Sequence, residues 1–560
     1  MGYTPEEAAL LRRYVSNLDR NIYTISNLPE EVVAVVFAKV SRSPHSFRDN
    51  LLALIQDREL ALAEGGAPAA GAGFDLEKAR RFHERVVIGY GHSSVAELAV
   101  AHVGIERVSR LASARLELSN PFLSFIEYSQ RYQRPARGAY YTPPELEAYP
   151  DLLERYRRLM DLTFDAYEEL LRGLVAYLRR ALPRGEQESE KAWSVRVEKT
   201  AFEDARYALT LAVHTNLGMT GNGRAIRDSL ARLLSDPYPE VRAMAAAIRE
   251  EVSAVLPVLL RHAEPNPYRM ETRAGVAALL REVAPPAPAG AGSAAADPGA
   301  SGLPLDLSGP VAERIRPPEA RLVEWTGQEA RQAAGRPGTV GQPAGPASPV
   351  PDMPPSEGGA GAGAIPPDEV PALVRVAEGL ALEYGAPGLE EGVRRLPPEQ
   401  LVRLFREAVE RLGPHDHPLE ALHRVHYGAA FTVSEACWHQ LLRHCRKVEF
   451  APAEPGTAYG WVVPPNVAAA GLTPVLERAV AAAEELYLRL VDRLPLAAPY
   501  VVTNAHRRRA LARFDLWELY HLVNLRGSSE AQWEIRQAIL DLNRQVAAVH
   551  PHLAPWPRRP

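Results

Sequence analysis

Two stretches rich in Pro, Gly and Ala interrupt this 560-residue chain and limit what it can fold into. One, at about 284–311, contains PAPAGAGSAAADPGASGLPLDLSGPV, and the other, at about 335–367, reads GRPGTVGQPAGPASPVPDMPPSEGGAGAGAIPP. Neither carries enough apolar surface to form a core, so both are expected to be flexible. We therefore predict a first domain over residues 1–283, a flexible linker over 284–317, and a second domain over 318–560 that contains the insertion at 335–367.

Apolar residues recur at three- and four-residue spacing in two long segments, which is typical of amphipathic helices. PDLLERYRRLMDLTFDAYEELLRGLVAYLRRAL covers residues 150–182, and LTPVLERAVAAAEELYLRLVDRLPL covers residues 472–496. Each follows a Tyr- or Pro-rich segment, AYYTPPEL or GWVVPPNV, and each precedes another stretch predicted to be helical, at 204–234 and 498–526. The repeated order favours an internal duplication. The alternation in RLVEW, residues 321–325, predicts one strand at the start of the second domain.

Composition excludes several classes of protein. A net charge of -5 gives no sign of a nucleic-acid or membrane partner. The two cysteines, Cys437 and Cys445, suggest neither a disulfide framework nor a metal site, so no metal is expected. The N-terminus lacks a signal-peptide pattern and no long apolar run occurs, which predicts a cytoplasmic protein. Arg occurs at roughly one position in ten, so a lone Arg carries little information.

The segment NPFLSFIEYSQRYQR, residues 120–134, places five different polar groups within six positions. They belong to Glu127, Ser129, Gln130, Arg131 and Tyr132. Taken alone, this segment is explained by a solvated turn.

A second polar group lies in EACWHQLLRHCRKVEF, where Gln440 and Arg443 are one helical turn apart and His444 follows. Arg526 stands later, in the run NLRGSSEAQWEIR. These segments resemble the flavin-dependent thymidylate synthase family. Its signature is Arg-His-Arg, seven residues and Ser, within a pattern that ends in Ser-x-Arg-Tyr, and its C-terminal helix carries a similar NLR...AQWEIR run. The resemblance implies an α+β fold with two tandem domains, each a small sheet packed with long helices.

The signature is divided between the halves. Glu127, Ser129, Arg131 and Tyr132 match the Glu-x-Ser-x-Arg-Tyr part, but Ser119, Asn120 and Pro121 stand at the Arg-His-Arg positions. In the second half, Arg443 and His444 match the first two signature positions and Cys445 stands at the third, while Ala451, Ala453 and Pro455 stand at the Glu, Ser and Arg positions. Each half thus keeps what the other lacks, which predicts one composite site completed by both halves.

The resemblance also assigns ligand positions. The substrate-binding residues it implies are Glu127, Ser129, Gln130, Arg131, Arg206, Gln440, Arg443 and Arg526, and the flavin-binding residues are Ser41, His92, Ser94, Asn222, Arg224, Arg443 and His444. Simpler interpretations exist for each. His92 and His444 could be structural histidines, Ser41 and Ser94 helix caps, Asn222 part of a turn, Arg526 a helix-end cation and Cys445 a small core residue.

By this resemblance the chain would methylate dUMP to dTMP reductively, with FAD as cofactor and methylene-tetrahydrofolate and NADPH as co-substrates. Arginines suit a phosphate dianion, Gln440 suits a uracil edge, and positive charge at Arg443 and His444 suits an anionic reduced flavin. No protein nucleophile is expected, because the flavin carries the chemistry. C5 alkylation of another pyrimidine nucleotide and a catalytically silent flavin- or nucleotide-binding protein remain alternatives. A homodimer that forms a tetramer-like assembly is expected.

Overall fold

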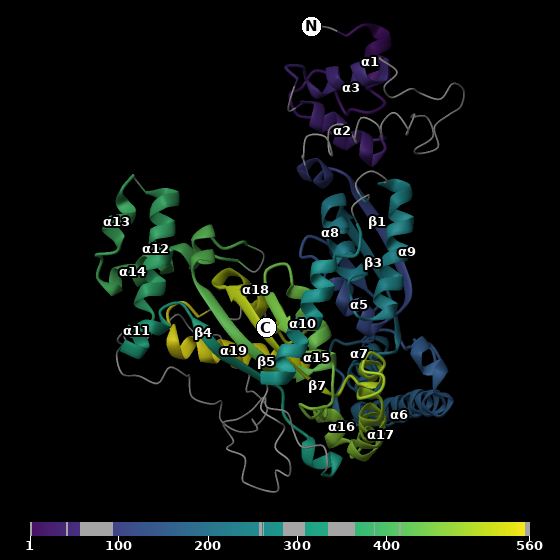
Figure 1. The fold of residues 1–560 in the computed structure, drawn as a ribbon. Helices are drawn as coiled ribbons and strands as arrows, with labels where there is room; N and C mark the ends of the chain where they lie inside the picture. The colour runs from purple at the N-terminus through teal and green to yellow at the C-terminus, as the bar shows by residue number, and fades with distance from the viewer. Residues whose placement is uncertain are drawn as a thin grey trace. The chain divides into compact units, whose positions relative to one another are not determined.

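A computed structural model describes residues 3–40, 43–56, 93–256, 260, 263–283, 309–333, 365–385, 387–413 and 416–554. The chain forms two compact units (Figure 1). Unit 1 comprises Met1–Tyr128 and His214–Pro286, and unit 2 comprises Ser129–Val213 and Ala287–Pro560. Residues 129–213 of the predicted first domain therefore belong to the same unit as the C-terminal half. The sequence-based boundaries at 283 and 318 stay a prediction, and most of the predicted linker and insertion lies outside the described residues.

Unit 1 contains a small antiparallel sheet and several helices. Its helices are α1 (Pro5–Leu11), α2 (Glu30–Val40), α3 (Phe47–Gln56), the 3-10 helix η2 (Ser93–Glu97), α5 (Arg110–Glu117), α8 (Gly223–Leu234), α9 (Pro239–Val255) and α10 (Pro267–Val283). Its strands are β1 (Val100–Ser109), β2 (Ser124–Glu127) and β3 (His214–Asn222), in the order β1-β3-β2. The first three helices share an apolar core of their own that includes Leu11, Val36 and Leu51. Helix α2 contributes to this core from its residues 32–38, VVAVVFA, which are all apolar.

Unit 2 contains the other sheet and the longest helices. Its α-helices are α6 (Pro150–Ala181), α7 (Glu190–Ala205), α11 (Gln328–Ala333), α12 (Val370–Tyr384), α13 (Leu389–Val393), α14 (Pro398–Val409), α15 (Glu435–Leu441), α16 (Pro465–Ala469), α17 (Thr473–Val491), α18 (Leu516–Arg526) and α19 (Trp533–Val549). Its 3-10 helices are η3 (Pro144–Ala148), η4 (Arg206–Ala208), η5 (Val311–Arg314), η6 (Glu420–Arg424), η7 (Leu442–His444) and η8 (Ala498–Val501). Its strands are β4 (Glu319–Trp325), β5 (His426–Ser434), β6 (Glu449–Pro452) and β7 (Arg507–Asp515).

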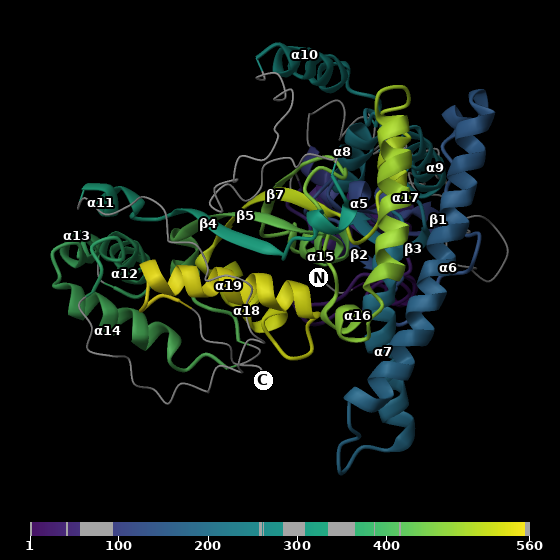
Figure 2. The ribbon, with the colours of Figure 1, turned by 90° about the horizontal axis from the view of Figure 1, so that it is seen from below.

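The sheet of unit 2 has the order β4-β5-β7-β6, and all its neighbouring strands are antiparallel. Helix α19 packs along β4 and β5, and α17 packs on α6, as Figure 2 shows. Phe164 and Leu170 of α6 share one buried apolar cluster with Leu476 and Val480 of α17. Segments that lie far apart in the sequence therefore stabilise one common core.

The structure confirms the predicted α+β class, the strand at 321–325, which lies within β4, and the long helices α6 and α17. The prediction of continuous helix over 204–234 and 498–526 is wrong, because β3 and β7 occupy the middle of these stretches. In β3 the buried and less buried residues alternate as far as Asn222, which is the period of a strand. Helices α8 and α18 begin only at the residues that follow these strands.

The two units repeat one local design, a strand that ends in a Ser followed by a helix. Ser109 caps α5 and Ser434 caps α15. The carboxylate of Glu240 accepts hydrogen bonds from the backbone and hydroxyl of Ser109, at 2.7 and 2.6 Å. The carboxylate of Glu534 accepts the same two bonds from Ser434. Because a buried carboxylate at both helix starts is more specific than a shared helix pattern, the repeat supports an internal duplication.

Strand register shows which residues of the two halves correspond. The caps of α8 and α18, Asn222 and Asp515, are equivalent, since each ends its strand and accepts a hydrogen bond from the helix. Glu127 pairs with Leu217 in one sheet, and Pro452 pairs with Ala510 in the other. The counterpart of Glu127 is therefore Pro452, one residue after the Ala451 predicted by alignment without gaps. The second half lacks the carboxylate at either position.

Counterparts from the two halves also pair with each other inside unit 2. In the same alignment, Leu209 corresponds to Val502 and Leu211 corresponds to Asn504. The N–H of Leu211 donates to the carbonyl of Val502 at 2.9 Å, and the N–H of Asn504 donates to the carbonyl of Leu209 at 2.8 Å. Such reciprocal contacts are typical of an interface between two copies related by a two-fold axis. Here one chain forms such contacts between its own repeats.

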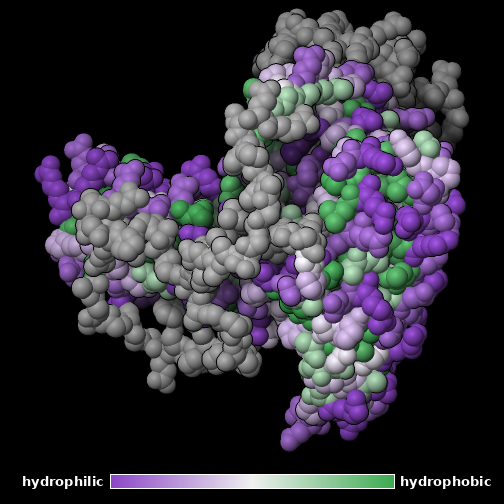
Figure 3. Space-filling model, turned by 60° about the horizontal axis from the view of Figure 1, so that its bottom comes forward, coloured by the Kyte–Doolittle hydropathy of each residue, from purple (hydrophilic) through white to green (hydrophobic). Residues whose placement is uncertain are grey.

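None of the helices described in the structure is long and apolar enough to cross a membrane. On the face drawn in Figure 3, hydrophobic and hydrophilic residues are interspersed over the described surface.

Candidate functional site

The polar segment of the first half leads into unit 2, where it contacts helix α7 and the segment between α18 and α19. Arg131 Nε lies 2.6 Å from Glu203 Oε1 of α7, and Arg131 Nη2 donates to the carbonyl of Glu530 at 3.4 Å. Glu530 belongs to the NLRGSSEAQWEIR run. The side chains of Arg131 and Glu203 are only 16% and 13% exposed, so this segment is not a simple solvated turn. Ser129 Oγ accepts the N–H of Arg131 at 3.3 Å, which shapes the turn.

The side chain of Asn504 forms hydrogen bonds with both Gln130 and Arg206. The Nδ2 of Asn504 donates to the carbonyl of Arg206 at 2.9 Å and to Oε1 of Gln130 at 3.5 Å. All three residues are buried. Because Oε1 of Gln130 accepts from Asn504, Nε2 is left as a donor, and it has no hydrogen-bond partner among the described residues.

Gln440 and Arg443 lie on the helix that continues β5. Gln440 is buried, and its Nε2 donates to the carbonyl of Ala436 at 3.0 Å, one turn back along α15. Its Oε1 is buried and finds no hydrogen-bond donor in the described part of the chain. Arg443 is exposed and its Nε donates to the carbonyl of His439. A buried carbonyl oxygen without a donor is energetically unfavourable.

Arg526, at the end of α18, connects these residues. Its Nε donates to Nε2 of His444 at 2.9 Å, and its Nη2 donates to the carbonyl of Gln440 at 3.4 Å. Burial, followed by the positive charges of Arg443 and Arg131, lowers the pKa of Arg526 to about 10. Arg443 and Arg131 therefore lie close enough to Arg526 for their positive charges to act on it. An anion bound among them would relieve this repulsion.

His444 is a buried neutral side chain. Burial and the charge of Arg526 lower its pKa to about 3, and its Nδ1 lies 2.9 Å from Oε1 of Glu518. Burial raises the pKa of Glu518 to about 7. The expectation that His444 supplies positive charge to a flavin is wrong, because the imidazole is uncharged at neutral pH. Of the pair Arg443 and His444, only Arg443 carries the charge that was predicted.

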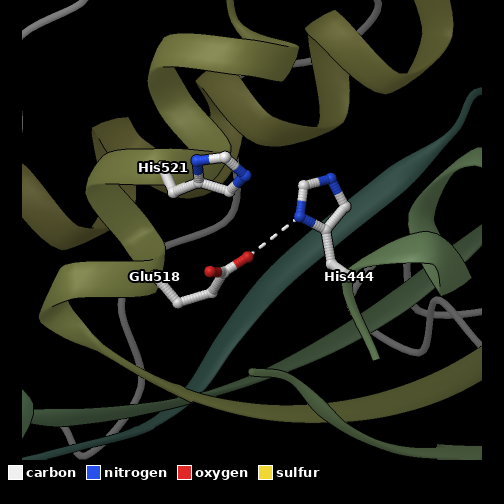
Figure 4. Close-up of side chains that lie close together, drawn as sticks. All are labelled: His444, Glu518 and His521. Atoms are coloured by element: carbon white, nitrogen blue, oxygen red, sulfur yellow. Dashed lines mark hydrogen bonds and ion pairs between the residues drawn. The ribbon is translucent and has the colours of Figure 1, made fainter. Parts of the chain in front are cut away.

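His444, Glu518 and His521 offer ligand atoms that all lie within 4.8 Å of one another (Figure 4). Glu518 and His521 project from the same helix toward His444, and the dashed line marks the bond between His444 and Glu518. A divalent cation would have to replace this bond, and Nε2 of His444 is already used by Arg526. The arrangement therefore suits hydrogen bonding better than metal coordination.

Several predicted ligands lie in unit 1. Glu127 is buried, with Oε1 at 2.6 Å from Arg110 Nη1 and accepting from Ser113 Oγ at 2.8 Å. Asn222 caps α8 by accepting from the N–H of Ala225, so it is a helix cap and not the plain turn considered above. Arg224 is paired with Glu97 at 2.6 Å on the surface. The flavin and substrate roles of these residues stay predictions. Ser41, His92 and the side chain of Ser94 lie outside the described residues.

Sequence reasoning missed Glu518 and Asn504. Glu518 follows Asp515 in the pattern Asp-x-x-Glu, which indicates a helix start and so explains the residue without a functional role. Asp515 does cap α18, and the Glu518 side chain nonetheless reaches His444. Asn504 lies in no recognisable motif, and only the pairing of the two halves brings it beside Gln130.

Comparisons with known proteins identify the family to which the chain is similar. A family model described as "Thymidylate synthase complementing protein" matches residues 25–258 and 389–552. The chain is 32% identical over 291 residues to a UPF0159 protein of Chlamydia muridarum, which covers 50% of this chain and 54% of that relative. It is 24% identical over 564 residues to a UPF0159 protein of Chlamydia pneumoniae, covering 98% of this chain and 93% of the relative. The chain thus spans about half the length of one relative and nearly all of the other.

A flavin-dependent thymidylate synthase of Sulfurisphaera tokodaii is 31% identical over 185 residues, covering 32% of this chain and 61% of that enzyme. The predicted resemblance is confirmed. Because the family model covers well over half of the chain, in two segments that include both parts of the divided signature, the chain belongs to the thymidylate synthase complementing protein family.

Proposed function

We propose that the chain methylates dUMP to dTMP reductively, with FAD as cofactor and methylene-tetrahydrofolate and NADPH as co-substrates. The observation that carries this proposal is the cation cluster of Arg131, Arg443 and Arg526 beside two buried amides of Gln130 and Gln440 whose ligand-facing atoms lack partners among the described residues. All five side chains belong to unit 2. The segment 129–131 comes from one repeat and the remaining groups come from the other.

The cations provide a site for the phosphate of the nucleotide. A phosphate monoester carries close to two negative charges at neutral pH, and guanidinium groups bind it through charge-assisted hydrogen bonds. The pKa of Arg526 is lowered to about 10, so the guanidinium is less stable as a cation than in water but is still charged at neutral pH. Binding of a dianion would raise this pKa again, so the repulsion among the arginines favours the bound state. Buried Arg206 lies beside Gln130 through Asn504 and can add a further cation.

The two amides provide a site for the base. Oε1 of Gln440 can accept from an N–H, because its Nε2 already donates to Ala436. Nε2 of Gln130 can donate to a carbonyl, because its Oε1 already accepts from Asn504. A uracil ring presents both groups on one edge, whereas a ring with an unprotonated ring nitrogen at that position would face the Gln440 oxygen with a lone pair.

A flavin is compatible with the donor set of this cluster. Arg443 is exposed beside Arg526 and offers positive charge to a reduced isoalloxazine ring or to a cofactor diphosphate. When bound, the reduced flavin supplies the hydride that completes the new methyl group. The chain's own residues bind the nucleotide, orient its base and exclude water from the buried amides. None of them is required as a nucleophile.

Two alternatives are supported by specific observations. Cys445 stands where the family signature has a second arginine, which removes a cation and favours a protein that binds nucleotide or flavin without turnover. The donor and acceptor of Gln130 and Gln440 also suit other pyrimidine nucleotides with an imide edge, which favours C5 alkylation of such a nucleotide.

The proposal is tested with the purified full chain. Its absorbance should show bound flavin, and incubation with dUMP, methylene-tetrahydrofolate and NADPH should form dTMP, measured by chromatography. Substitution of Arg526 with Leu should abolish product while the flavin spectrum persists. Bound flavin and bound dUMP without any product would support the silent protein, and absence of both flavin and dUMP binding would contradict the proposal.

We further propose that two chains associate into a tetramer-like assembly in the cytoplasm, where these substrates are available. The reciprocal pairing of counterpart residues in unit 2 supports this, because one chain already joins two repeats as a symmetric dimer joins two subunits. Light scattering should give twice the mass of the 61.4 kDa chain. A monomeric mass at micromolar concentration would contradict the proposed assembly.

A further inference from the structure

Arg526, His444 and Glu518 form a continuous chain of hydrogen bonds at the edge of the cation cluster. Arg526 Nε donates to His444 Nε2 at 2.9 Å, and an arginine nitrogen can only donate. Nε2 of the imidazole must therefore be the acceptor, and the proton of the neutral ring must lie on Nδ1. Nδ1 then donates to Oε1 of Glu518 at 2.9 Å. Each bond fixes the direction of the next.

The secondary structure makes this connection rigid. Glu518 and Arg526 both belong to α18 and are separated by just over two turns, so they share one side of the helix. His444, at the end of η7, bridges them from another segment. His444 is 6% exposed and Glu518 is 3% exposed, so water does not compete strongly for these bonds.

We propose that Glu518 and His444 are positioning residues that hold the guanidinium of Arg526 in the orientation that binds the nucleotide phosphate. This inference rests on the proposed function. The Nε of Arg526 is used by His444 and one Nη2 hydrogen by Gln440, so among the described residues three N–H groups of Arg526 remain available to a ligand. Without His444, the long Arg526 side chain could rotate, and phosphate binding would have to restrict it.

This role differs from the flavin contact predicted for His444. Both ring nitrogens of His444 are already hydrogen-bonded within the protein, so the ring has no remaining polar atom for a cofactor. The orientation of Arg526 thus depends on Glu518, which touches neither nucleotide nor cofactor in the proposed site. If Glu518 positions Arg526, its loss should weaken the binding of ligands that carry a phosphate and leave other ligands unaffected. If Glu518 only stabilises the fold, its loss should affect both kinds of ligand equally.

The experiment compares dUMP with deoxyuridine, which has the same base and sugar but no phosphate, by calorimetry on the full chain. Glu518→Leu should weaken dUMP binding by about tenfold or more, the size expected for a weakened charge-assisted hydrogen bond, and leave deoxyuridine binding unchanged. Glu518→Gln keeps an acceptor for Nδ1 and should stay within about threefold of the parent. His521→Ala serves as the comparison on the same helix, because it removes an exposed imidazole beside Glu518 and leaves the bonds from Glu518 to His444 and from His444 to Arg526 in place; dUMP binding should stay within about threefold of the parent.

Equal weakening of dUMP and deoxyuridine by Glu518→Leu would overturn the inference, as would unchanged binding of both. If Glu518→Leu fails to fold, the pair His444→Gln and His444→Leu decides. A Gln amide can donate to Glu518 and accept from Arg526, so His444→Gln should retain the preference for dUMP and His444→Leu should lose it. Equal preference in both variants would contradict the positioning role. A parent protein that does not bind dUMP would contradict the proposed function itself, which keeps the two failures distinguishable.

Discussion

Substitution of Arg443 with Gln is predicted to weaken nucleotide binding without destabilising the unbound protein. Burial and the neighbouring charges of Arg443 and Arg131 lower the pKa of Arg526 from 12.5 to about 10. Keeping Arg526 charged in the folded state therefore costs on the order of 3 kcal/mol, at about 1.4 kcal/mol for each pH unit. Burial accounts for the largest share, so removal of the exposed Arg443 charge should return only a few tenths to about 1 kcal/mol of unfolding free energy.

The same substitution removes one charge-assisted hydrogen bond to the phosphate, which is worth about 1.5 to 3 kcal/mol. The dissociation constant for dUMP should therefore rise roughly 10- to 100-fold. Urea unfolding of the unbound protein and calorimetric titration with dUMP measure the two effects separately. Arg446→Gln is the matched control, because it removes the same charge from an exposed residue three positions later. The reasoning is refuted if Arg443→Gln binds dUMP as tightly as this control, or if it lowers the free energy of unfolding by more than about 1 kcal/mol.

Three further predictions concern residues around the site. Arg131→Ala should abolish measurable dUMP binding in calorimetry, because it removes a phosphate ligand and leaves the carboxylate of Glu203, 13% exposed, without its cation; retained affinity would argue against this. The pKa of buried Asp204 is raised from 3.8 to about 7, so its stabilising contribution is present below pH 3.8 and lost as the pH rises through 7. Between pH 4 and 7 the parent should lose about 1.4 kcal/mol of unfolding free energy per pH unit relative to Asp204→Asn, as measured by urea unfolding. A difference between the two proteins that does not change with pH would contradict the raised pKa of Asp204. Ser434→Ala should lower the free energy of unfolding by about 1 to 3 kcal/mol, because α15 loses its cap and buried Glu534 loses a donor; a change below about 0.5 kcal/mol would contradict this.

The long helices could be predicted from sequence because their apolar spacing is sustained over many turns. Helix α6 ends at Ala181, one residue before the end of the predicted segment 150–182. Strands β3 and β7 could not be predicted in the same way. Each is enclosed between helical segments, and β7 contains the charged side chains of Arg507 and Arg508, which are buried and form ion pairs with Glu319 and Glu435. Local periodicity does not contain that information.

The membership of the candidate site could be predicted in part. Gln440, Arg443 and Arg526 were identified through motif spacing, and the structure brings them together with Arg131. The bond between Arg526 and His444 could not be predicted, because it depends on how α18 packs against η7. The burial that makes His444 neutral depends on the same packing, which is why its predicted charge was wrong.

Because the family signature is divided between the two repeats, we expect one nucleotide site in each chain. By the strand register and the helix caps, the counterparts of Arg443, His444, Arg526 and Arg206 in the other repeat are Leu118, Ser119, Leu233 and Pro499, none of which is a cation. In the structure Leu233 is buried in α8, and Ser119 Oγ donates to the carbonyl of Leu116. These residues serve the fold of their own segments. A second nucleotide site equivalent to the first is therefore not expected in the chain.

The stoichiometry of dUMP binding to the flavin-loaded full chain tests this central claim most directly. Calorimetry should give one dUMP and the flavin absorbance one flavin per 560-residue chain, with dUMP binding lost in Arg131→Ala, from one repeat, and strongly weakened in Arg443→Gln, from the other. Dependence of one binding event on both repeats is what a composite site requires. Two equivalent dUMP sites per chain, or binding that survives unchanged when either arginine is replaced, would contradict it.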